Sequence, residues 1–278
     1  EKLIGKCSVY KDELRAASAS YTAQEFNLLN DLNNLTVNGR KLEENEKHLI
    51  VDKVKTSNTI NMRKIIADAM GEKIEEFYGA RIDKSEKEIF HKFEVYNKMR
   101  KALAAIHVNI EEFSRDDLDE IGYILTINTD KEAMMEAFDN SRLELPGEIK
   151  NCLISLRKTN GALFSKWHSF SLKIMNELIP EMYRQPKEQM TLLTEMGVMK
   201  GQTDEFEKNK YIPVDVASED IFNPVVRRSV RISFKILNEL MKKYGTLDEV
   251  VIEMPRDRNS DEQRKWEKET QKKNEKEQ

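Results

Sequence analysis

The sequence predicts a mainly α-helical chain in which many short helices precede one longer helix and one short strand. Three observations favour this fold class. Charged residues make up 35% of the 278 residues, while the chain holds only 10 glycines and 6 prolines. Apolar residues recur at three- and four-residue steps in many segments. The β-branched run Val250-Val251-Ile252, near the C-terminal end, is typical of a short buried strand.

The first 18 residues are expected to be irregular, and a helix is expected from about Thr22 to Leu35. Phe26, Leu29 and Leu32 would form its inward face. This helix is rich in poor helix formers. A polar outer face that ends in a C-terminal cap is favoured over a polar network that holds a backbone or a phosphate. The residues concerned are Asn27, Asn30, Asp31, Asn33 and Asn34.

Residues 40 to 145 are expected to form a run of short amphipathic helices. One runs from about Glu43 to Lys55, and a longer one runs from about Glu86 to Ile106. Between them, Thr59 is expected to cap a helix that stops at Gly71.

Two further helices are expected to start at Ser114 and Asp130, because both residue types are good N-caps. Asp117 follows Ser114 by three residues, which adds an acid in the first turn. Beyond residue 185, one more helix and an extended connector that ends near Pro213 are expected.

The segment 149–176 has a strong charge asymmetry, with five Lys or Arg residues and no Asp or Glu. At the chain-wide rate of 50 acids in 278 residues, about five acids are expected in such a segment. Its cations can neutralise phosphates, and the amides that start a helix expected from about Ser169 to Met182 can donate to phosphate oxygens. A loop with a solvated basic face and Trp167 in the core explains the same residues equally well. The cations are Lys150, Arg157, Lys158, Lys166 and Lys173.

The C-terminal helix and strand contain one anomalous residue, Glu253. Asn223 and Pro224 are expected to start the helix and Gly245 to stop it. Pro255 ends the strand that follows. A carboxylate inside an apolar strand needs a cation, a metal ion or water beside it, so Glu253 requires a partner. The inward helix face holds Val226, Val230, Phe234, Leu237 and Met241, and a basic stripe of Arg228, Arg231, Lys235 and Lys242 lies away from it.

Composition excludes several classes of protein. The net charge of −4 excludes a uniformly basic nucleic-acid binder, so any binding of nucleic acid would depend on local basic patches. Cys7 and Cys152 are too few for a disulfide framework or a zinc cage, which favours a reducing compartment. No apolar run reaches the roughly 18 residues of a membrane span. From residue 256 to 278, 15 of 23 residues are charged, which indicates a solvated helix or tether.

The C-terminal pattern resembles the second RuvC segment of the type II CRISPR-associated RNA-guided DNA endonucleases (Cas nine). Two earlier stretches resemble recognition-lobe blocks of the compact members of that family. The resemblance covers most of the chain, with the least similarity between residues 40 and 145. The matching residues are Asn223-Pro-Val-Val-Arg-Arg-Ser-Val230, Asn238, Lys242-Lys-Tyr-Gly245, Val251-Ile-Glu-Met-Pro-Arg-Asp257, Gly5-Lys-Cys7 through Arg15 with Phe26-Asn27 and Leu29 to Leu35, and His168 to Lys173 with Asn176.

The resemblance implies a piece of a longer protein. Residues 1–215 would be a multi-helix recognition lobe, 216–258 a helix–strand segment of a RuvC (RNase H-like) domain, and 259–278 a charged linker toward the HNH domain. The lobe would hold the guide RNA–target DNA heteroduplex, whose shape and backbone Cas nine proteins read while base pairing reads the sequence. The candidate nucleic-acid contacts, from the basic segment and the matching blocks, are Arg15, Asn30, Arg157, Lys158, Lys166, His168, Ser169, Lys173 and Asn176.

The resemblance also implies the remaining partners and the chemistry. Glu253 aligns with the RuvC glutamate that binds Mg²⁺ for cutting the non-target strand. Its fellow ligands, two aspartates and a histidine, would come from other segments, so this segment alone is expected to be inactive. Guide RNA and target DNA would be partners, an anti-CRISPR inhibitor is a further candidate, no membrane is involved, and the location would be the bacterial cytoplasm.

Two residues depart from the family pattern. Pro255 stands where members usually carry alanine, and Asp257 stands where they carry glutamate. Pro255 follows Glu253 by two residues and should leave that ligand in place. The alternative interpretation of the whole chain is a non-catalytic helical scaffold that binds protein partners, in which Glu253 pairs with a cation and the basic stripe is merely solvated.

Overall fold

The computed structural model describes residues 4–57, 59–198, 209–218, 221 and 224–245. These residues are mainly helical, which confirms the predicted fold class at that level. The chain divides into two compact units, Glu1–Lys200 and Gly201–Gln278, called the first and second unit below. The domain boundaries given above remain predictions.

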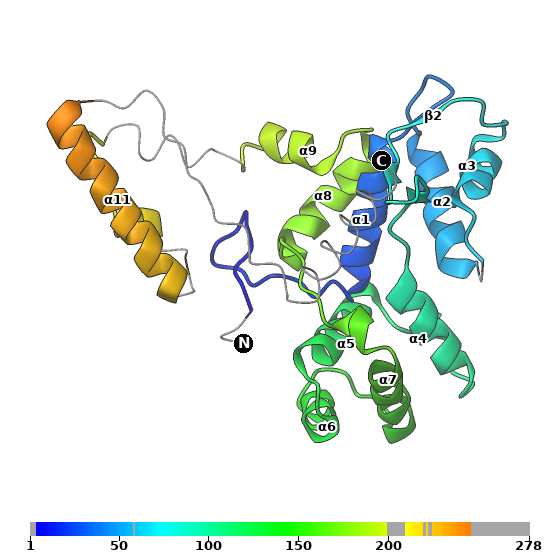
Figure 1. Ribbon diagram of the computed structural model, residues 1–278. Helices are drawn as coiled ribbons and strands as arrows, with labels where there is room; N and C mark the ends of the chain where they lie inside the picture. The colour runs from blue at the N-terminus through cyan, green and yellow to red at the C-terminus, as the bar shows by residue number, and fades with distance from the viewer. Residues whose placement is uncertain (1–3, 58, 199–208, 219–220, 222–223, 246–278) are drawn as a thin grey trace, which may run out of the picture. The chain divides into compact units, whose positions relative to one another are not determined.

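Short helices build the described part of the first unit (Figure 1). They are α1 (Tyr21–Asn34), α2 (Glu44–Thr56), α3 (Met62–Met70), α4 (Glu94–Ala104), α5 (Arg115–Ile127), α6 (Lys131–Asp139), α7 (Gly147–Thr159), α8 (Leu172–Arg184) and α9 (Gln189–Glu195), with 3-10 turns η1 (Ile110–Glu112) and η2 (Gly161–Phe164). Two antiparallel strand pairs join them: β1 (Thr36–Val37) with β2 (Phe77–Tyr78), and β3 (Arg81–Ile82) with β4 (Glu88–Ile89).

Helix α1 packs against α2, α4, α5 and α8. One hydrophobic core gathers side chains from α1, α2, α3, α8 and α9, and a second gathers side chains from α4, α5, α6 and α7. Ser20 starts α1, because its Oγ accepts the Ala23 N–H at 3.2 Å. Phe26, Leu29 and Leu32 are fully buried, which confirms the predicted inward face.

Local capping signals predicted several helix ends correctly. Ser114 and Asp117 form a capping box at the start of α5, and the Asp130 side chain caps α6. Gly71 ends α3 in the left-handed region, with a φ of 69°. Thr59 was wrongly expected to cap α3: the cap is Asn61, whose Oδ1 accepts the Lys64 N–H at 3.2 Å.

The long helix expected from Glu86 to Ile106 is wrong in its first part. Residues 88–89 are strand β4, and α4 begins only at Glu94. A hairpin turn precedes β4, because the Asp83 Oδ1 accepts the N–H groups of Ser85 at 2.7 Å and Lys87 at 2.9 Å. Glu86 has a φ of 60°, which a helix does not allow.

Buried Asp31 ties this hairpin to α1. Its carboxylate accepts the Arg81 Nε at 2.9 Å and Nη2 at 2.8 Å, and it accepts the His91 backbone N–H at 2.6 Å. Burial alone would raise the pKa of Asp31, but hydrogen bonds from His91 and Arg81 hold that pKa below its usual range. The carboxylate therefore remains ionised and keeps the hairpin in place.

The polar face favoured for α1 is also wrong, because its amides hold the backbone of the same chain. The Asn33 Nδ2 donates to the carbonyl oxygens of Met182 at 2.9 Å and Lys187 at 2.7 Å. The Asn30 Oδ1 accepts the Gln189 N–H at 2.9 Å. Asn33 is buried, so α1 uses a polar network to fix the end of α8 and the start of α9.

Lys47 on α2 completes this junction. Its side chain is fully buried, and its Nζ donates to the carbonyl oxygens of Met182 at 2.7 Å, Tyr183 at 2.9 Å and Gln185 at 3.0 Å. The last carbonyls of a helix have no partner within the helix and carry partial negative charge, so a cation there is favourable. Burial lowers the pKa of Lys47 to about 8.

The second unit contains η3 (Val216–Ser218) and α11 (Pro224–Tyr244). Gly245 stops α11 with a φ of 92°, as predicted. The Asn238 side chain clamps the preceding connector, since its Oδ1 accepts the Ile212 N–H and its Nδ2 donates to the Ile212 carbonyl, both at 2.8 Å. Asn223, the predicted strand with Glu253, and the charged tail lie outside the described residues.

Candidate nucleic-acid interface

A backbone ladder joins two stretches that lie far apart in the sequence. Residues 165–171, called the strap below, connect η2 to α8 and lie against the N-terminal segment. The Ser18 N–H donates to the Lys166 carbonyl at 3.0 Å, and the His168 N–H donates to the Ala16 carbonyl at 2.8 Å. The Ala16 N–H donates to the Phe170 carbonyl at 2.9 Å. The basic segment and the segment that carries Arg15 therefore form one surface.

His168 anchors the strap by its ring as well as its backbone. The Nδ1 accepts the Phe170 N–H at 3.0 Å, so the neutral ring carries its proton on Nε2, 3.1 Å from the Asn27 Oδ1. The ring also lies edge-on to Phe26, with the ring centroids 5.6 Å apart. Burial, with smaller contributions from His91 and Arg15, lowers the pKa of His168 to about 4.

Acid should therefore weaken the first unit through His168. Between pH 6.5 and about 4 the unfolded chain binds a proton that the folded chain does not, so stability falls as pH falls through this window. The variant His168→Gln retains an N–H donor but does not titrate. On acidification its free energy of unfolding should therefore fall by about 2–3 kcal/mol less than that of the unchanged chain. Urea unfolding at pH 7 and pH 4 measures this difference, and parallel losses in both proteins would contradict it.

Arg15 lies at the edge of a hollow of about 580 Å³ beside the strap. Lys173 and Asn176, which belong to α8, line the same hollow. The Arg15 Nε donates to the Lys6 carbonyl at 3.0 Å, and a Cβ at Gly5 would stand 3.1 Å from that Nε. Glycine at position 5 thus permits the close approach that orients the guanidinium.

The N-terminus of α8 opens into this hollow. Ser171 is its N-cap residue and lines the hollow, but its side chain does not cap the helix. Its buried Oγ has no hydrogen-bond partner among the described residues. The sequence predicts that this helix starts near Ser169, whereas in the structure α8 starts at Leu172. The N-terminus of a helix is suited to a phosphate oxygen.

Five acids also line this hollow, namely Asp12, Glu13, Asp116, Asp119 and Glu120, and the last two are already engaged. Asp119 accepts the Thr22 N–H at 2.8 Å and the Thr22 Oγ1 at 2.6 Å, and burial raises its pKa. Glu120 pairs with Arg142 at 2.6 Å. These contacts limit how strongly Asp119 and Glu120 can repel a phosphate held by Arg15 and Lys173.

The remaining candidate contacts occupy other positions. Lys166 and Asn27 line a neighbouring hollow of about 270 Å³, whereas Lys158 is exposed on α7. The Arg157 Nε donates to the Leu125 carbonyl at 2.7 Å, and the Asn30 side chain is engaged with α9. Ser169 is exposed, and its carbonyl accepts the Ser8 N–H at 3.0 Å. All these residues remain predicted contacts, but Arg157 and Asn30 already have partners within the fold.

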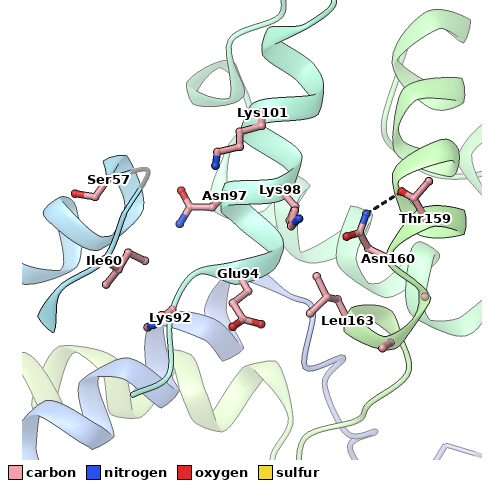
Figure 2. A pocket seen from close by; sticks show the side chains of 12 residues that line it. Ser57, Ile60, Lys92, Glu94, Asn97, Lys98, Lys101, Thr159, Asn160 and Leu163 are labelled. Atoms are coloured by element: carbon pink, nitrogen blue, oxygen red, sulfur yellow. Dashed lines mark hydrogen bonds between the residues drawn. The ribbon is translucent and has the colours of Figure 1, made fainter. Parts of the chain in front are cut away.

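Sequence reasoning missed three lysines of a further hollow, about 490 Å³ in volume, between α4 and the turn that joins α7 to η2 (Figure 2). They are Lys92, Lys98 and Lys101. The spacing of Lys98 and Lys101 places them on one helix face, which is the signal that could have identified them. No charge asymmetry marked them, because Glu94 lies between them in the sequence.

Comparison with known proteins identifies the family. The chain is 45% identical over 271 residues to the CRISPR-associated endonuclease Cas9 1 of Streptococcus thermophilus, which covers 95% of this chain and 24% of the relative. The chain is a homologue of one segment of Cas9. Cas9 of Staphylococcus aureus is 31% identical over 263 residues, again covering 94% of this chain and 24% of the relative. The chain thus spans about a quarter of the length of these Cas9 relatives.

Solved Cas9 structures share the fold. A cryo-EM structure of an St1Cas9–sgRNA–tDNA59–ntPAM complex matches 88% of this chain and 29% of the solved chain, with a TM-score of 0.72 and 44% identity. A related complex that also contains AcrIIA6 matches 90% of this chain and 30% of the solved chain, with a TM-score of 0.70 and 43% identity. No protein-family model matches the chain.

The described residues show neither a metal cluster nor a membrane span. They contain no group of three or more His, Cys, Asp or Glu side chains placed to hold a metal ion, and Glu253 lies outside them. Among the helices described here, none is long and apolar enough to cross a membrane.

Proposed function

We propose that this segment of a Cas9-type, RNA-guided DNA endonuclease holds the guide RNA–target DNA hybrid and supplies one ligand of the RuvC nuclease site. The backbone ladder between the strap and residues 16–18 is the observation that supports the first part of the proposal, binding of the hybrid. It joins the two stretches that resemble recognition-lobe blocks and gathers Arg15, Lys173 and Asn176 around one hollow. Homology to proteins named as endonucleases supports the second half.

The binding mechanism is neutralisation of phosphates along the hybrid backbone. Arg15, Lys166 and Lys173 are exposed. When these side chains neutralise phosphates of a duplex, the counterions bound to those phosphates are released. The free amides at the start of α8 donate to a phosphate oxygen without reading a base. Such contacts fix the register of the protein on the duplex and leave sequence choice to base pairing, as in Cas9-type effectors generally.

The nuclease half of the proposal concerns Glu253. Homology to Cas9 endonucleases supports a divalent metal cofactor, and we assign Mg²⁺ with Glu253 as one carboxylate ligand. A metal ion bound there would activate water for hydrolysis of a phosphodiester. Since the other ligands would come from segments outside this chain, the segment alone would be inactive.

Partners and location follow from the same homology. We propose guide RNA and target DNA as partners because similar solved Cas9 structures contain sgRNA and tDNA. An anti-CRISPR inhibitor is a further proposed partner, because one similar structure contains AcrIIA6. The bacterial origin of the relatives supports action in the bacterial cytoplasm.

Salt dependence tests the binding half. Lys166→Ala with Lys173→Ala should weaken binding of an RNA–DNA hybrid and lower the salt slope by about two units, one per lost phosphate contact. Lys64→Ala with Lys131→Ala is the matched control, because both lysines are exposed and neither lines a hollow described above. Filter binding across a salt series measures the slope. An unchanged slope in the Lys166→Ala with Lys173→Ala protein, called the strap variant below although Lys173 lies on α8, would remove both lysines from the interface.

A further inference from the structure

The cleft between α4 and the turn after α7 has an unusual set of hydrogen-bonding groups. Figure 2 shows Lys92, Lys98 and Lys101 around the chain that enters and forms α4, with Asn160 across from them. None of the three ammonium groups makes an ion pair or a hydrogen bond among the described residues. Glu94 is the one acid among the residues that line this cleft.

The amides in the cleft are already satisfied. The Asn97 Nδ2 donates to the Val54 carbonyl at 3.2 Å. The Asn160 Nδ2 donates to the Leu156 carbonyl at 3.1 Å and to the Thr159 Oγ1 at 2.8 Å. The charged donors left over are the lysine ammonium groups, so the complementary ligand is an anion that carries several acceptor oxygens.

The cleft is continuous with the surface beside the strap. The hollow that contains Lys166 shares Lys92, Glu94, Ala162 and Leu163 with it. A row of lysines thus runs from Lys166 through Lys92 to Lys98 and Lys101. Lys98 and Lys101 lie three residues apart on one helix face, so their side chains are neighbours and can contact phosphates close together on one strand.

We propose that this cleft binds further phosphates of the same RNA–DNA hybrid, along the duplex from those that contact the strap. The inference rests on the proposed function and extends it to residues that neither the charge asymmetry nor the family resemblance assigned. Lysine offers point charges without the planar fork of arginine, which suits phosphates in a backbone and gives no choice of base. An acidic protein segment is the competing occupant.

The test uses the 278-residue chain and a blunt RNA–DNA hybrid of about 20 base pairs, the length of a guide hybrid. We expect Lys98→Ala with Lys101→Ala, called the α4 variant below, to lower the salt slope by about two units. Raising the salt from 50 to 200 mM should then weaken binding about tenfold less in this variant than in the unchanged chain. The strap variant, Lys166→Ala with Lys173→Ala, should lower the slope by a similar amount. The fourfold variant should lower it by about four units, because separate phosphates contribute additively.

Controls separate the possible failures. Circular dichroism should show unchanged folding, because Lys98 and Lys101 are exposed, and the Lys64→Ala with Lys131→Ala variant should retain the full slope. A normal slope in the α4 variant beside a reduced slope in the strap variant overturns the inference and leaves the proposed function standing, as does a fourfold variant no weaker than the strap variant. A normal slope in the strap variant overturns the proposed function itself.

Discussion

Glu253→Ala in the full-length protein is expected to abolish cutting of the non-target strand while guided binding stays nearly intact. A metal ion at a phosphodiester supplies several kcal/mol of transition-state stabilisation, so losing one of its ligands should slow cutting by at least about 10²-fold. The hybrid is held by other residues, so the dissociation constant should change by less than about threefold. A strand-specific nicking assay on a labelled duplex, with a binding assay beside it, measures both effects.

Two matched variants sharpen this test. Glu253→Gln keeps the shape of the side chain and removes its charge, so it should cut as poorly as the alanine variant. Glu239→Ala removes a well-exposed carboxylate of α11 that pairs with Lys242, so it should cut normally. Normal nicking by Glu253→Ala would refute the RuvC assignment, and equal losses from Glu239→Ala would show that the effect is not specific to position 253.

Lys47→Met should destabilise the first unit by about 3 kcal/mol, which is more than a hundredfold in the folding equilibrium. Methionine keeps the apolar stem but leaves the carbonyls of Met182, Tyr183 and Gln185 without their shared donor. Buried carbonyls that lose a charged donor incur the full cost of desolvation. Urea unfolding followed by circular dichroism measures the change.

Lys53→Met is the control for this prediction. Lys53 lies on the same helix, is exposed, and has no side-chain partner within the described part of the chain. Its replacement should change the unfolding free energy by less than about 0.5 kcal/mol. A similarly small change for Lys47→Met would mean that the junction of α2, α8 and α9 does not depend on this cation.

Features that depend on neighbouring residues could be predicted from the sequence. The caps at Ser114 and Asp130 and the stop at Gly71 are local signals, because each acts within one helical turn. Helix α7 was not predicted although Ile149, Leu153 and Leu156 have helical spacing, because a basic segment without acids is equally consistent with a solvated loop.

Features that depend on distant partners could not be predicted. Asp31 meets Arg81 across 50 residues, and Lys47 meets the Gln185 carbonyl across 138 residues. Nothing near Lys47 in the sequence marks it as buried, since lysine is almost always exposed. The candidate site divides in the same way: composition marked the strap as basic, but the ladder to Ala16 and the lysines of the α4 cleft appear only when the chain is folded.

Binding of two RNA–DNA hybrids of unrelated sequence tests the central claim most directly. If the first unit reads a hybrid by its backbone, the 278-residue chain should bind both with dissociation constants that agree within about threefold, and both should weaken steeply between 50 and 200 mM salt. No binding at 50 mM salt, or an affinity that depends on the sequence and not on the salt, would contradict the account and favour a protein-binding scaffold.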